Sequence, residues 1–140
     1  MDKTELWECP DCGNRFTTAK VWHSCGKYGF ERHFDRKEPI VVELFEAFRE
    51  MVERCGEVVC YPQKTRIVFQ SRIRFAHCQT RKSHLAVGLI LPDEFPDFEQ
   101  LTKIEKYGEQ SFGHYFKMAS IDDFDQRFGE LVEKAFSTGS

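Results

Sequence analysis

The sequence predicts an α+β fold: a mostly antiparallel sheet with helices packed on one face, preceded by a small zinc-knuckle-like module. Two amphipathic helical patterns, at residues 39–55 and 120–136, enclose a series of short apolar runs separated by turns. These turns are too short for parallel crossovers, so neighbouring strands are expected to pair as hairpins. A cysteine-rich stretch of different composition comes before the first helix.

Length and composition are typical of a globular protein of ordinary size. The chain has 140 residues, of which 41% are hydrophobic and 31% charged, and this balance excludes an intrinsically disordered chain. No apolar run approaches the ~20 residues that span a bilayer, and the first residues lack the apolar core of a signal peptide. We therefore expect a cytoplasmic protein. The net charge of −3 excludes a globally basic nucleic-acid binder, although not a local basic patch.

The predicted zinc-knuckle-like module covers residues 1–38. Two residues separate Cys9 from Cys12, a spacing that directs both sulfurs at one point, and Cys25 follows after a gap typical of small zinc fingers. We predict a structural zinc site formed by Cys9, Cys12, Cys25 and His33, with His23 as the alternative fourth ligand. Four protein ligands leave no open coordination position, so the metal would hold the fold together and would not catalyse. A metal-free loop with buried thiols is the competing interpretation.

The remaining cysteines, Cys55, Cys60 and Cys78, are scattered among apolar residues. Without a secretion signal the expected compartment is reducing, so disulfides are not expected. We predict that these three are small core side chains.

The α+β domain is predicted to cover residues 39–140 and to begin with a helix. Pro39 suits the first helical position, and Gly56 suits the residue just past the end. Apolar side chains recur every fourth residue between them and form one stripe: Ile40, Leu44, Phe48 and Val52.

Strands are predicted at residues 58–61, 66–69, 73–77, 85–91 and 112–118. Residues 85–91 are nearly all apolar, which indicates a central strand buried on both faces. Residues 98–107 fit a helix or a strand. The last element is predicted to be a helix that begins at Ser120, with Asp123 as a capping-box partner. Its apolar stripe consists of Phe124, Phe128, Leu131, Val132, Ala135 and Phe136.

Several stretches of the chain resemble the domain-of-unknown-function 5655 family. The most specific stretch is residues 7–13, Trp-Glu-Cys-Pro-Asp-Cys-Gly, followed by residues 22–25 and by His33-Phe34. Looser matches are residues 61–64, 74–76, His114 and residues 121–125. The resemblance implies a compact bacterial α+β domain, sometimes preceded by a cysteine-rich module, with no established activity. It also favours a strand over a helix at residues 98–107.

Basic residues are concentrated in one part of the chain. Residues 61–92 contain six basic and no acidic residues, whereas the rest contains 14 basic and 23 acidic residues. Lys64 and Arg66 have the same parity, as do Arg72 and Arg74, so pairing of these strands would create a basic face or edge. Such a face can bind nucleic acid or a small anion. A solvated sheet face neutralised by the acidic helices is the competing interpretation.

The expected function is binding. The sequence has no glycine-rich phosphate loop, no GxSxG and no HExxH, so the expectation leans against an enzyme. We expect a small zinc-binding protein whose basic sheet face recognises an anionic ligand or nucleic acid through Lys64, Arg66, Arg74 and His114. One alternative is a small enzyme or small-ligand-binding protein with a pocket near Lys64, Arg74 and His114. Another is a protein-interaction module that uses exposed phenylalanines.

Overall fold

The structure is a computed structural model that describes residues 7–8, 15–16 and 30–139. Near the N-terminus, β1 (Trp7–Glu8) and β2 (Arg15–Phe16) pair antiparallel. The elements that follow are α1 (Glu31–Phe34), α2 (Pro39–Glu53), β3 (Val59–Pro62), β4 (Ile67–Gln70), β5 (Arg74–Thr80), β6 (Leu85–Leu91), β7 (Leu101–Gly108), β8 (Ser111–Met118), the 3₁₀ helix η2 (Ile121–Asp123) and α3 (Gln126–Gly139). No helix within the described part of the chain is long and apolar enough to cross a membrane.

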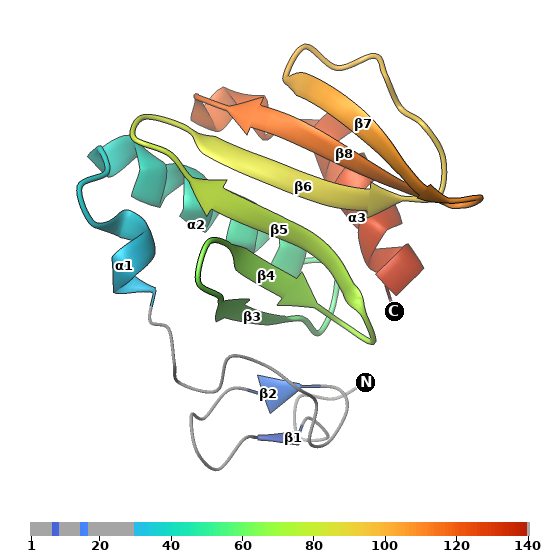
Figure 1. Ribbon diagram of the computed structural model, residues 1–140, viewed down its shortest axis with the longest axis horizontal. Coiled ribbons are helices and arrows are strands. Elements are labelled where there is room, and N and C mark those ends of the chain that lie inside the picture. Colours follow the sequence, from blue (N-terminus) through green and yellow to red (C-terminus); the bar gives the residue numbers. More distant parts are fainter. Residues whose placement is uncertain (1–6, 9–14, 17–29, 140) are drawn as a thin grey trace.

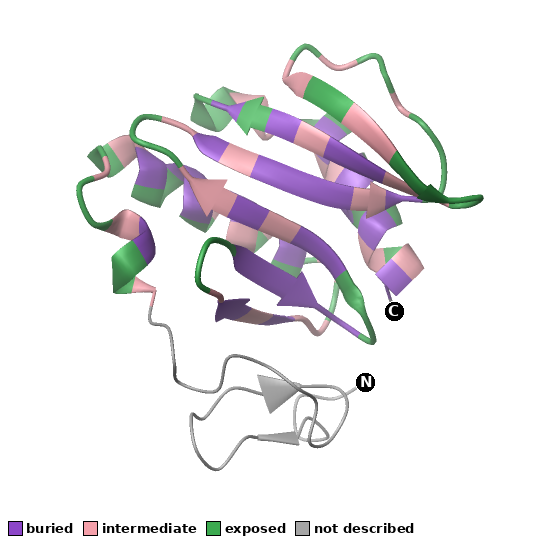
Figure 2. Ribbon diagram, viewed as in Figure 1, coloured by how far each residue is buried: buried purple, intermediate pink, exposed green. Residues whose placement is uncertain are grey.

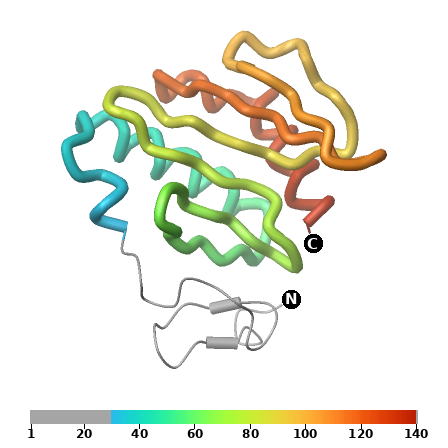
Figure 3. Tube along the Cα trace, in the orientation of Figure 1, coloured from blue at the N-terminus to red at the C-terminus, as the bar shows by residue number. Residues whose placement is uncertain are grey.

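One six-stranded antiparallel sheet forms the centre of the domain, in the order β3-β4-β5-β6-β8-β7. In Figure 1, α2 and α3 lie side by side behind this sheet, and the Cα trace in Figure 3 follows the same two layers. The predicted α+β fold with its mostly antiparallel sheet and helices on one face is therefore confirmed. The strand order departs from a simple meander, because β8 inserts between β6 and β7.

The hydrophobic core lies between the helices and the sheet. The predicted stripe of the first helix is confirmed: α2 begins at Pro39 and buries Leu44, Phe48 and Val52. The Phe48 ring meets the Phe69 ring of β4 edge-on, with centroids 5.1 Å apart. Aromatic rings from the helices and from the sheet form one cluster, so this face of the sheet packs against α2 and α3. The two helices do not cover the opposite face.

The three cysteines of the domain behave as apolar side chains. Cys78 is fully buried in the core cluster, and Cys55 and Cys60 pack against it. Burial raises the pKa of the Cys60 thiol to about 12 and that of Cys78 well above its usual value. These two thiols are therefore neutral at pH 7 and are poor nucleophiles.

The start of the last helix differs from the prediction. Ser120 and Asp123 do form a capping box, but it closes the single 3₁₀ turn η2, and α3 begins only at Gln126. A second carboxylate, Asp125, accepts a hydrogen bond from the Phe128 backbone N–H at 2.9 Å and caps the helix proper. The capping box predicted at Ser120 is therefore present, but the α-helix begins at Gln126 and not at Ser120.

The strand predictions also need one correction. Residues 98–107 contain β7, which agrees with the strand that the family resemblance favoured. Residues 85–91 form β6, an internal strand, but only one of its faces is fully buried: Leu85, Val87, Leu89 and Leu91 face the helices, whereas Ala86 and Ile90 are half-buried. Figure 2 shows this change of burial along β6. The helices form one layer and cover one face of the sheet. The nearly continuous apolar sequence of residues 85–91 therefore does not mean that both faces of this strand are covered.

The face of the sheet turned away from α2 and α3 is called the outer face below. Cross-strand register places Val68, His77, Gly88 and Tyr115 in one row on this face, from β4 to β8. The neighbouring row, which includes Leu89 and His114, points toward the helices. This alternation decides which side chains can reach a ligand on the outer face.

Candidate functional site

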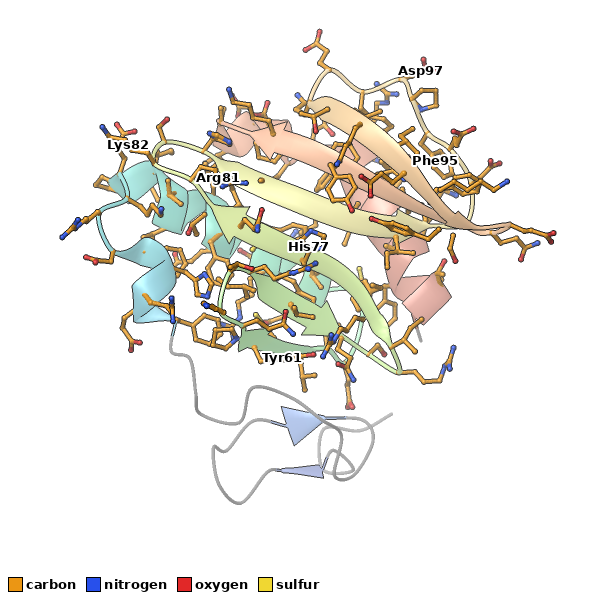
Figure 4. All side chains as sticks on the ribbon, in the orientation of Figure 1. Tyr61, His77, Arg81, Lys82, Phe95 and Asp97 are labelled. Atoms are coloured by element: carbon orange, nitrogen blue, oxygen red, sulfur yellow. The ribbon has the colours of Figure 1, made fainter. Side chains whose placement is uncertain are left out.

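A groove of about 410 Å³ lies on the outer face. Its lining comes from four strands: His77 and Gln79 of β5, Ala86 of β6, Lys117 of β8 and Lys103 of β7. Figure 4 labels His77 in the middle of β5 and Arg81 near the turn that leads into β6. The groove therefore belongs to the sheet itself and is supported by its hydrogen-bonded ladder.

At two glycines of the outer face, the absence of a side chain lets an aromatic ring pack against the backbone. A Cβ at Gly88 would come within 2.2–2.8 Å of three atoms of the His77 ring, so the imidazole rests on the Gly88 backbone. A Cβ at Gly113 would come within 2.5–2.9 Å of three atoms of Tyr107, so this ring rests on β8 in the same way. Glycine within a strand commonly marks such a close approach.

Hydrogen bonds hold the tyrosines of this face in place. The hydroxyl of Tyr107 contacts the hydroxyl of Tyr115 and donates to Glu105 Oε2 at 3.0 Å. Lys103 Nζ lies 2.7 Å from Glu105 Oε1 and 4.9 Å from the centroid of the Tyr115 ring. The bond from Lys103 lowers the pKa of Glu105, and partial burial together with its two hydroxyl contacts raises the pKa of Tyr107. Glu105 is therefore ionised and Tyr107 neutral at pH 7.

One end of the groove is cationic. Arg81, His84 and Lys117 line it together, and Lys117 and Arg81 both help to lower the pKa of His84, after the larger effect of burial. Arg81 Nη2 also donates to Gln79 Oε1 at 3.1 Å, which holds the guanidinium over the outer face. Among the residues that line the groove, Arg81, Lys103 and Lys117 are basic and only Glu105 is acidic. The groove therefore favours a negatively charged ligand.

His77 contributes a neutral ring to this surface. Burial, with a smaller contribution from the positive charge of Arg66, lowers its pKa to about 4. At pH 7 the imidazole is therefore uncharged and can take part in ring stacking or in one donor and one acceptor hydrogen bond. Its centroid lies 5.9 Å from that of Tyr115.

The basic residues singled out from the sequence lie at different places. Lys64 is exposed in the turn between β3 and β4, and Arg66 is close enough to His77 to influence its titration. Arg74 lies on the outer face, where its Nε donates to the hydroxyl of Tyr61 at 2.8 Å. Tyr61 is buried and donates in turn to Gln70 Oε1 at 2.9 Å. Arg66 and Arg74 thus extend the positive charge of the outer face toward β4.

His114 lies on the opposite face of the sheet from Arg74. It is fully buried, its Nε2 accepts a hydrogen bond from the Phe95 backbone N–H at 3.0 Å, and its Nδ1 therefore carries the proton and donates to the Phe112 carbonyl at 3.0 Å. Burial lowers its pKa, so the ring is neutral. With both nitrogens engaged, His114 fixes the loop between β6 and β7, and the structure does not bring it together with Lys64 and Arg74.

The predicted zinc ligands fall largely outside the described residues, where Cys9, Cys12, His23 and Cys25 are located. His33 lies on α1 and is buried, and its Nε2 lies 2.7 Å from the Gln63 carbonyl oxygen. A carbonyl oxygen only accepts, so Nε2 carries the proton and Nδ1 carries the lone pair. This arrangement fits a zinc ligand, because such histidines usually donate their other N–H to a carbonyl or carboxylate. Within the described residues, no group of three or more His, Cys, Asp or Glu side chains could hold a metal ion.

Several groove residues were missed at the level of sequence. Lys103 and Glu105 share one parity in β7, and Tyr115 and Lys117 share one in β8. The period of two within each strand was the available signal. The glycines at 88 and 113, each inside an apolar strand, were a second signal of close approach.

The fold and the groove define a small α+β domain whose sheet presents a polar, mainly basic outer face. The chain belongs to the family described as Domain of unknown function (DUF5655), whose profile matches residues 30–139. The match begins just before α1 and extends to the end of α3, and α1 packs on the domain through the Phe34 and Phe45 rings, 5.2 Å apart. No curated protein and no solved structure matches the chain. The predicted domain boundary at residue 39 stays a prediction.

Proposed function

We propose that the protein is a binding module whose outer face holds an anionic ligand in the groove between β5 and β7. The observation that carries this proposal is the cationic end of the groove, where Arg81, His84 and Lys117 converge. Of the lining residues only Glu105 is acidic, and its charge is already paired with Lys103. Arg81 and Lys117 therefore remain to bind the charge of a ligand such as a phosphate group.

The position of the groove supports a binding role. An antiparallel sheet with one face against helices leaves its other face accessible, and here this face carries charged, aromatic and glycine residues in register. The His77 ring lies against the Gly88 backbone, so this part of the groove has its shape before a ligand arrives. A preformed site loses less conformational entropy on binding than a flexible one.

Isothermal titration calorimetry with tripolyphosphate as the probe tests this proposal. Lys117→Gln is expected to weaken binding about fivefold, which corresponds to about 1 kcal/mol for one exposed ionic contact. Lys103→Gln is expected to act in the same direction, whereas Lys106→Gln changes nothing, because Lys106 lies on the same strand as Lys103 but pairs with Phe112 on the helix side. Equal effects of Lys103→Gln and Lys106→Gln, or no binding at all, would contradict the proposal.

We also propose that Cys9, Cys12, Cys25 and His33 hold a structural zinc ion. Two observations support it: the chain between the paired strands β1 and β2 contains the two-cysteine motif, and the His33 Nε2–H bond to Gln63 leaves Nδ1 for the metal. When bound, zinc would supply a tetrahedral crosslink, and four protein ligands would leave no position for a substrate. His33 would join the cysteine-rich segment to the sheet.

Native mass spectrometry before and after a strong chelator tests the zinc proposal. One zinc per chain is expected, lost in Cys12→Ser and in His33→Ala but retained in His23→Ala. His84→Ala serves as a control for removing a histidine of the domain. Retention of zinc in His33→Ala with loss in His23→Ala would assign the fourth ligand to His23, and absence of metal under reducing conditions would refute the site.

A further inference from the structure

We propose that the ligand of the outer face is single-stranded nucleic acid, whose unpaired bases stack on the rings of His77 and Tyr107. This inference rests on the proposed anion-binding function and names the ligand class for the outer face, which includes the groove and Tyr107 beside it. It depends on three features of the described residues: two rings that lie against the sheet, hydrogen bonds that hold Tyr107, and cations beside the rings.

The rings of His77 and Tyr107 provide the surfaces on which bases would stack. Each rests on the backbone of a glycine in the neighbouring strand, His77 on Gly88 and Tyr107 on Gly113, so one side of each ring is covered by the sheet. Tyr107 is 55% exposed, and His77 is half-buried. Every base has a π-face, so a ring presented in this way binds bases with little sequence preference.

Tyr115 lies between the two rings and contacts both of them. Its ring centroid lies 5.9 Å from that of His77, and its hydroxyl contacts the hydroxyl of Tyr107. Glu105 accepts from the Tyr107 hydroxyl at 3.0 Å and lies 3.4 Å from that of Tyr115. Successive bases of a strand could therefore occupy positions on either side of Tyr115 without rearrangement of the protein.

Cations lie where the sugar–phosphate chain would pass. Lys103 Nζ lies 4.9 Å from the centroid of the Tyr115 ring, where its charge neutralises that of Glu105. Arg81 and Lys117 line the groove at the end next to the β5–β6 turn, and Arg66 is close to His77 on the side of β4. Single-strand binding proteins combine aromatic rings, on which the bases stack, with cations that bind the phosphates.

The same features argue against a duplex and against a small anion as the main ligand. In a duplex the bases are already stacked on one another, so their faces cannot reach His77 or Tyr107. A small anion would use Arg81 and Lys117 at one end of the groove but would leave the two rings without a partner. The arrangement of rings over several strands therefore favours a chain with repeated bases.

Fluorescence anisotropy with the full-length protein tests the inference, using fluorescein-labelled 12-mers. One probe is oligothymidylate, the second is an abasic strand with the same phosphates, and the third is a duplex. Base stacking is expected to make oligothymidylate bind about tenfold more tightly than the abasic strand. The duplex is expected to bind no more tightly than the abasic strand, because only its phosphates are recognised.

Variants of Tyr107 separate stacking from charge. Tyr107→Leu is expected to weaken oligothymidylate binding about tenfold and to leave abasic binding unchanged, whereas Tyr107→Phe keeps the ring and retains most of the affinity. Lys103→Gln is expected to weaken both single strands alike, because it leaves the negative charge of Glu105 unpaired on this face. Because the Tyr107 side chain is mainly exposed, circular dichroism is expected to show the same fold for both Tyr107 variants.

The outcomes distinguish this inference from the proposed function. Equal affinity for oligothymidylate and the abasic strand, or tighter binding of the duplex, would refute base stacking even if tripolyphosphate still bound. Unchanged oligothymidylate affinity in Tyr107→Leu would refute it as well. Failure of every oligonucleotide and of tripolyphosphate to bind would refute both proposals together.

Discussion

Replacement of Gly88 by alanine tests whether the outer face is built as described. The added Cβ would lie 2.2 Å from Cε1 of His77 and 2.5 Å from its Nε2, so the ring would have to retreat by roughly 1.3–1.8 Å to reach ordinary van der Waals contact. His77 has only two side-chain torsions and packs beside Tyr115. Overpacking of this kind costs typically about 1–3 kcal/mol, which lowers the midpoint of thermal unfolding by about 3–10 °C for a chain of this size.

Two further glycines provide the comparison for this substitution. Gly113→Ala would meet Tyr107, with contacts of 2.5–2.9 Å, but this ring is mainly exposed and can swing outward. Gly108→Ala would meet only Ser111 Cβ at 3.9 Å, so it reports the general effect of exchanging glycine for alanine in a strand. The expected order of stability is Gly108→Ala, then Gly113→Ala, then Gly88→Ala.

Thermal unfolding followed by circular dichroism, with urea unfolding as a second measurement, gives the three differences in unfolding free energy. If Gly88→Ala unfolds at the same temperature as Gly108→Ala, the His77 ring does not rest on Gly88, and this part of the account is wrong. If Gly113→Ala is the most destabilised of the three, Tyr107 is held more firmly than its exposure indicates, and the proposed order is refuted.

Three other predictions follow from the same structure. The imidazole of His77 should titrate near pH 4 by NMR. Its folded pKa lies below the ordinary 6.5, so protonation of the unfolded chain should remove up to about 3 kcal/mol of stability as the pH falls from 6.5 to 4; a titration at or above 6.5 would contradict this. Tyr61→Phe removes the donor to buried Gln70 and should lower the unfolding free energy by about 1–3 kcal/mol in urea, whereas an unchanged value would show that the bond contributes nothing. Ser120→Ala opens the capping box with Asp123 and should lower it by about 0.5–2 kcal/mol, measured in the same way, and no loss would contradict the role of the cap.

The elements of the fold could be predicted because their signals are local. The four-residue period that begins at Pro39 identified α2, and alternation in short apolar runs identified the strands. The capping box at Ser120 was also recognisable, since it depends on residues only three apart. The later start of α3 was not, because a 3₁₀ turn and an α-helix share the same capping residues.

The composition of the site could not be predicted in the same way. Parity within one run does not show which face a residue occupies in the sheet, and a register shift between Phe69 and Gln70 breaks the parity from β4 to β5. Arg74 and His114 therefore could not be assigned to opposite faces from their sequence positions. The insertion of β8 between β6 and β7 brings Tyr115 beside His77, which lies far from it in the chain. Such long-range pairing leaves no trace in local periodicity.

The central claim is that the outer face of the sheet binds an anionic ligand, and ¹H–¹⁵N chemical-shift mapping with tripolyphosphate tests it most directly. The largest shifts are expected at His77, Arg81, Lys103 and Lys117, with little change along α2 and α3 on the other side of the sheet. Saturable shifts confined to this face would support the account. Shifts centred on the helices, or none at millimolar tripolyphosphate, would contradict it.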